Sequence, residues 1–170
     1  MASLMEEFIN VLEEENRKYA QLVELSRAKT QTIIHANIDE LTRITTGEQE
    51  IIDELVALEE KRGAVRRGMA DVLNKTPQEL TLLNMAEMFS SRPEEKEKLL
   101  DLRERIRLTL IEVAKVNSQN ETLLRQAMEM LEFDMTLVKS MKQAPSTNNY
   151  NRRAYNTDSY LPSSGFDAKR

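Results

Sequence analysis

Apolar residues recur at alternating intervals of three and four residues along most of this 170-residue chain. That spacing places them along one line of an α-helix, which we call a seam, and it is typical of helical bundles and coiled coils. It predicts one long helix from about Leu4 to His35 and a second from Asn37 through Val72. A third runs from Pro93 almost to Pro145. Asn37 is the predicted N-cap of the second helix, because its side chain can accept from the free amides of the first turn.

Two breaks that contain proline separate the second and third helices. Thr76 precedes Pro77, and Glu79 follows three residues later, which is the signature of a helix N-terminus. A short helix is therefore predicted over about residues 77–89. Together the segments predict an all-α fold, an elongated antiparallel helical bundle or coiled coil of three long helices and one short one.

The chain changes character at Pro145, where the periodicity ends and Asn and Ser become frequent. We therefore predict a helical domain over residues 1–144 and a disordered tail over residues 145–170. Aromatic residues are unusual in disordered segments and are common anchors of docking motifs. The tail nevertheless contains four of them, and they are Tyr150, Tyr155, Tyr160 and Phe166.

Composition and charge disfavour several classes of partner. Asp and Glu number 29 against 24 Lys and Arg, and the resulting net charge of −5 gives no general attraction to nucleic acid or to an anionic membrane. The acidic N-terminus differs from a signal peptide, and no apolar run approaches the roughly 20 residues of a membrane span. We therefore expect a cytoplasmic protein that does not insert into membranes.

Catalytic and metal-binding motifs are missing from the sequence. His35 is its one histidine and no cysteine is present, so neither thiolate metal sites nor the ExxH pairs of helical di-metal enzymes can form. No glycine-rich phosphate loop, GxSxG elbow or HExxH helix occurs either. We therefore expect no enzymatic activity, no catalytic residues, no metal and no cofactor.

The last helix is too long for its partners. At 1.5 Å per residue it would measure about 75 Å, against about 48 and 55 Å for the first two. If the helices are straight and antiparallel, the part after about Arg125 has no neighbour, yet residues 128–141 are rich in apolar side chains and in adaptable methionines. This stretch is either a partner-binding surface, a self-association surface, or a segment that folds back under the short helix. The candidate binding residues are Leu124, Met128, Met130, Leu131, Phe133, Met135, Leu137, Val138 and Met141.

Polar residues interrupt the seams. In the first segment they are Glu15, Ser26 and Lys29. In the last helix Asn120 occupies a seam position and Asn117 lies at its edge. These asparagines have two possible roles: a buried Asn can fix helix register at some cost in stability, or both can bind a partner's backbone or a loop that closes a groove.

The order of several motifs resembles the FlgN family of bacterial flagellar export chaperones. GEQEIIDELVALEEKR is followed by TPQEL and then by VNSQNETLL, and the resemblance covers roughly residues 1–142. The most specific positions are Glu48, Gln49, Leu55, Leu58, Glu59, Arg62, Asn117, Asn120, Leu123 and Leu124.

The resemblance implies a cytoplasmic chaperone that works without ATP. Its clients would be the hook–filament junction (hook-associated) proteins FlgK and FlgL. It would bind their C-terminal amphipathic segments, prevent premature assembly and deliver them to the type III export gate. Carried over to this chain, the last helix would bind the client and the Tyr150–Tyr160 tail would dock at the gate. The competing hypothesis is a homo-oligomeric coiled-coil structural or adaptor protein, which would form a homodimer without any client.

Overall fold

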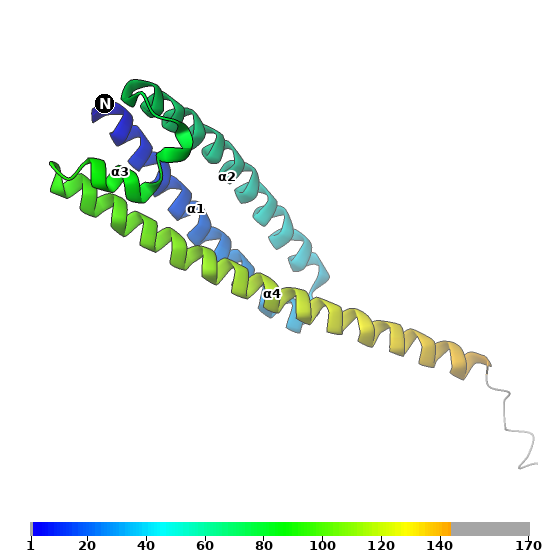
Figure 1. Ribbon diagram of the computed structural model, residues 1–170. Helices are drawn as coiled ribbons and strands as arrows, with labels where there is room; N and C mark the ends of the chain where they lie inside the picture. Colours follow the sequence, from blue (N-terminus) through cyan, green and yellow to red (C-terminus); the bar gives the residue numbers. More distant parts are fainter. Residues whose placement is uncertain (1, 144–170) are drawn as a thin grey trace, which may run out of the picture. The chain divides into compact units, whose positions relative to one another are not determined.

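The computed structural model describes residues 2–143 of the chain, and within them every regular element is helical (Figure 1). The long helices are α1 (Ala2–Ile34), α2 (Ile38–Leu73) and α4 (Pro93–Gln143). Between α2 and α4 lie a 3-10 turn, η1 (Pro77–Glu79), and a short helix, α3 (Leu82–Met88). The predicted all-α fold with three long helices that pack together is confirmed. Two compact units divide the chain, one ending at Met128 and the other beginning at Glu129.

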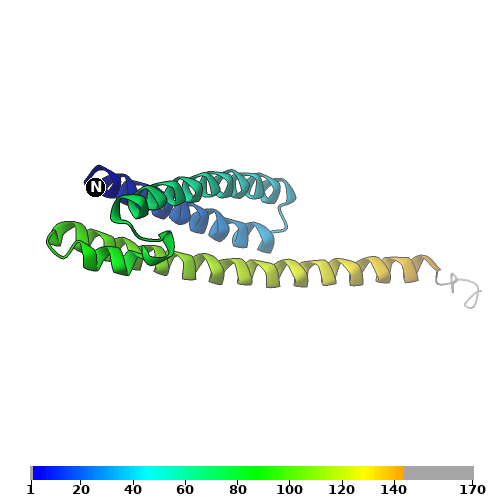
Figure 2. The same ribbon diagram turned by 45° about the horizontal axis from the view of Figure 1, so that its top comes forward.

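Local capping explains where α2 begins and ends. The Asn37 side chain accepts a hydrogen bond from the Glu40 amide at 3.1 Å, as its predicted N-cap role requires. At the other end Asn74 has a φ of 51°, and this left-handed conformation turns the chain out of the helix. Ala36, in the α1–α2 turn, has a similar φ of 52°. The turn allows α2 to run back alongside α1, as the two views show (Figures 1 and 2).

The predicted short helix is divided in two. The Thr76 amide and hydroxyl both donate to the Glu79 carboxylate at 2.7 Å, which closes the first turn as a capping box. The chain then leaves helical geometry at Leu80, and α3 starts afresh with Thr81 as its N-cap. The reason is Leu80 itself, which is 1% exposed because its side chain enters the core.

The main core lies where the start of α1, the end of α2, α3 and the start of α4 meet. Its largest members are fully buried: Met5, Phe8, Leu12, Met69, Leu80, Met85, Leu99 and Leu102. Met85 and Ala86 of α3 are buried in this core and Leu82 and Met88 pack against it, whereas Leu83 is exposed. Because this cluster draws on four elements, it fixes the helices at one end of the bundle.

Candidate functional site

Exposed apolar side chains are concentrated on α4 beyond Leu124. All eight residues predicted from Met128 to Met141 are exposed, and Phe133 and Met141 keep 67% and 71% of their surface. By contrast, Leu99 on the same helix is completely buried. Apolar surface left open over several helical turns is typical of an interaction site.

Leu124 differs from the other predicted binding residues because it is half-buried. It lies one helical turn after the buried Asn120, on the side of α4 that packs inside the first unit. Within the predicted set, the exposed residues therefore begin at Met128.

A buried polar cluster joins α1, α2 and α4 in the middle of the first unit. Asn120 is 3% exposed; its amide nitrogen donates to the Ser26 carbonyl at 2.8 Å, and its amide oxygen accepts from the Thr30 hydroxyl at 2.6 Å. The Ser26 hydroxyl in turn donates to Glu48 of α2 at 2.8 Å. Asn120 thereby uses both ends of its side chain to hold α4 against α1.

The charge of Glu48 is balanced inside the same cluster. The Lys29 ammonium lies 2.8 Å from Glu48 Oε2, while Oε1 accepts from Ser26. Asn117, in contrast, is exposed at the rim, with its oxygen 3.4 Å from the Ser26 hydroxyl. Ser26 and Lys29, two of the polar interruptions seen in the first seam, thus share one partner in α2.

The third interruption, Glu15, forms a separate ion pair nearer the main core. Glu15 is 2% exposed, and the Arg62 guanidinium lies 3.0 Å from its carboxylate. Burial raises the pKa of Glu15 above its usual value, and the positive charge of Arg62 opposes that rise. The sequence did not predict that Glu15 pairs with Arg62, or that Ser26 and Lys29 meet Glu48. In both cases polar residues at the seam positions of two helices lie together. Polar residues at seam positions of both helices are therefore the sequence signal that could have found these contacts.

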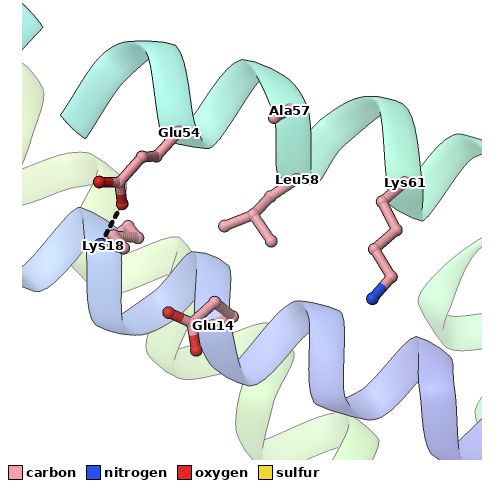
Figure 3. Close-up of a pocket in the computed structure, with 6 residues that line it drawn as sticks. All are labelled: Glu14, Lys18, Glu54, Ala57, Leu58 and Lys61. Carbon is pink, nitrogen blue, oxygen red and sulfur yellow. Dashed lines mark ion pairs between the residues drawn. The ribbon is translucent and has the colours of Figure 1, made fainter. Parts of the chain in front are cut away.

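An open cavity of about 370 Å³ lies on the surface between α1 and α2 (Figure 3). Leu58 and Ala57 line it, and the side chains around them are charged: Glu14, Lys18, Glu54 and Lys61. Lys18 and Glu54 pair with each other across the two helices. Its charged rim is typical of a solvated helix surface.

The described residues also show where the chemically distinctive groups lie. His35 is exposed just after α1, and its ring nitrogen Nδ1 lies 2.7 Å from the Gln31 carbonyl. Residues 2–143 contain no group of three His, Cys, Asp or Glu that could hold a metal ion. None of their helices is long and apolar enough to cross a membrane. Tyr150, Tyr155, Tyr160 and Phe166, the aromatic residues of the predicted tail, lie outside the described residues.

Fold and surface together define an all-helical protein with a polar layer across its bundle and apolar side chains displayed on one helical segment. The family model FlgN, described as FlgN protein, matches residues 1–157. The chain therefore belongs to the FlgN family, a family of flagellar export chaperones. No curated protein and no solved structure matches it.

Proposed function

We propose that this protein is a cytoplasmic chaperone for the hook-associated proteins FlgK and FlgL. It binds their C-terminal amphipathic helices, prevents premature assembly and delivers them to the type III export gate. The observation that carries the proposal is the exposed apolar surface from Met128 to Met141. An amphipathic client helix recognises such a surface through anchors spaced three and four residues apart.

The composition of this surface supports a chaperone with two different clients. Four of its eight apolar side chains are methionines, and they are Met128, Met130, Met135 and Met141. Unbranched thioether side chains adapt their shape to more than one partner. Burying each of these side chains against a client would contribute about 1.5–3 kcal/mol before the costs of association.

Isothermal titration with C-terminal segments of FlgK and FlgL tests this proposal. We expect a one-to-one complex of micromolar or tighter affinity. Phe133→Asp and Leu137→Asp should each weaken it at least tenfold without loss of helicity, because each places an unpaired charge in the interface and neither side chain is core. Thr136→Asp, which adds the same charge on the polar side of the helix, is the matched control. If Phe133→Asp and Leu137→Asp unfold the protein, this stretch is core instead.

The predicted tail supplies a second prediction. Deleting residues 145–170 should leave client affinity unchanged and impair delivery, because the proposed gate-docking residues Tyr150, Tyr155, Tyr160 and Phe166 are lost while α4 is kept. Titration measures the first quantity, and secretion of FlgK and FlgL by cells that carry the truncated protein measures the second. An equal loss of affinity on deletion would place the tail at the client site.

Self-association through the same residues is the second candidate function, because an exposed apolar helix also fits a second copy of the chain. Sedimentation equilibrium without client separates the two. A chaperone stays a monomer across the micromolar range, whereas a coiled-coil adaptor forms a homodimer that Phe133→Asp disrupts.

A further inference from the structure

The exposed apolar residues of the second unit form two separate stripes along α4. The first stripe contains Leu131, Met135 and Val138, at positions i, i+4 and i+7. The second stripe contains Met130, Phe133, Leu137 and Met141, at positions i, i+3, i+7 and i+11. With 3.6 residues per turn, the centres of the two stripes lie roughly 120° apart around the helix axis.

Together the stripes cover more of the helix than one partner helix can reach. They span roughly 200° of its circumference, whereas a helix packed on a single surface shows an apolar face of about 100°. One neighbouring helix packs along one seam. Two seams on one helix are the pattern of a bundle in which that helix touches two neighbours.

Charge marks the boundary between the stripes. Asp134 projects between the two stripes on the side where they adjoin, and it is exposed. The other side of the helix is polar and contains Glu132, Thr136 and Lys139. A partner that covers both stripes would bring two of its helices together over Asp134. An Arg or Lys of the partner at that junction would compensate the negative charge of Asp134.

We propose that residues 129–143 bind a client that presents two amphipathic helices at once, one on each stripe, with a basic side chain at their junction opposite Asp134. This inference rests on the proposed chaperone function and specifies the form of the client. The segment becomes the third helix of a mixed bundle.

Symmetry favours this occupant over a second copy of the chain. A two-fold dimer would use the same surface on both copies and, with one seam per contact, would leave the other stripe exposed.

Titration of matched variants tests the two-helix client. Met135→Glu alters the first stripe and Leu137→Glu alters the second. Thr136→Glu is the control, because residue 136 lies between them in the sequence but on the polar side of the helix. The probes are full-length FlgK and a synthetic peptide of its C-terminal helix. With full-length FlgK we expect both stripe variants to lose at least tenfold in affinity and the control to stay within twofold. With the peptide, Leu137→Glu should lose binding and Met135→Glu should match the wild type.

Cross-linking gives an independent measurement. The chain has no cysteine, so Met135→Cys and Leu137→Cys each carry a single benzophenone maleimide. Mass spectrometry should find the two labels attached to different helices of FlgK. Labels on one and the same helix would overturn the proposal.

The remaining outcomes separate this inference from the function on which it rests. If only one stripe variant weakens full-length FlgK, the client presents one helix and the two-helix proposal fails while the chaperone function stands. If wild type binds and neither variant weakens it, the client site lies elsewhere and the proposal fails with the surface assignment. If wild type binds neither probe, the proposed function itself fails. A client-free dimer cross-linked through Met135→Cys would show that a second copy occupies the first stripe, which also overturns the proposal.

Discussion

At the scale of single residues, the buried polar groups of the bundle matter because a buried polar atom without a hydrogen-bond partner is costly. Asn120 satisfies the Ser26 carbonyl and the Thr30 hydroxyl through opposite ends of one amide. A shift of α4 by one turn along α1 would break both hydrogen bonds and separate the buried Asn120 side chain from these partners. We infer that Asn120 fixes the register of α4, whereas Asn117 is exposed and contributes little to it.

Replacing Asn120 by alanine tests this inference. We expect Asn120→Ala to lower the free energy of unfolding by about 1–3 kcal/mol, because the two hydrogen bonds that its side chain makes to α1, at the Ser26 carbonyl and the Thr30 hydroxyl, are lost. Asn117→Ala is the matched control and should change it by less than about 0.5 kcal/mol. Urea denaturation followed by circular dichroism measures both. If the two substitutions lower the free energy of unfolding equally, Asn120 does not fix the register of α4 through its buried hydrogen bonds.

At the scale of elements, most residues at the helix ends are of a type that favours the backbone conformation found there, and one is not. Asn37 and Asn74 have side chains typical of the caps they form. Ala36 adopts a positive φ of 52°, although a Cβ atom makes the left-handed conformation unfavourable by about 1–2 kcal/mol. The α1–α2 turn therefore stores strain that the packing of the two helices maintains.

Ala36→Gly should relieve that strain. Part of the gain is offset by the greater freedom of glycine in the unfolded chain, so the expected stabilisation is about 0.5–1 kcal/mol. Ala28→Gly, at an exposed position inside α1, should instead destabilise by about 1 kcal/mol. Thermal and urea unfolding of the two variants provide the comparison. A destabilised Ala36→Gly protein would show that the turn is not strained.

At the scale of the whole molecule, the main core and the proposed binding surface belong to different parts of the chain. The cluster around Phe8, Met69 and Leu102 holds the first unit together. In residues 129–143 every side chain is exposed, so helix formation there gains little from packing. Isolated helices shorter than about 12–15 residues are marginal in water. Binding of a client would therefore also stabilise the helical conformation of residues 129–143.

Hydrogen exchange should reveal this division. Backbone amides of residues 129–143 are expected to exchange at least tenfold faster than those of residues 99–116, because local opening there exposes no buried core. Adding the FlgK C-terminal segment should slow exchange in residues 129–143 and leave residues 99–116 unchanged. Uniform protection along α4 before the client is added would contradict the proposed division.

The periodic pattern by itself determined the helices, because a seam spaced by three and four residues can be buried only when the chain is helical. It also located the apolar stretch over residues 128–141, because that stretch contains more apolar side chains than a single seam can hold. Motif order gave the family resemblance that the match over residues 1–157 confirms.

Only the tertiary structure decided which polar residues meet. Ser26, Glu48 and Asn120 lie far apart in the sequence, and their hydrogen bonds depend on the register and rotation of three helices. The same is true of Glu15 and Arg62. Leu80 likewise divides the predicted short helix because a core contact overrides local propensity. Periodicity states which side of a helix is buried; the neighbour it meets there follows from how the whole bundle packs.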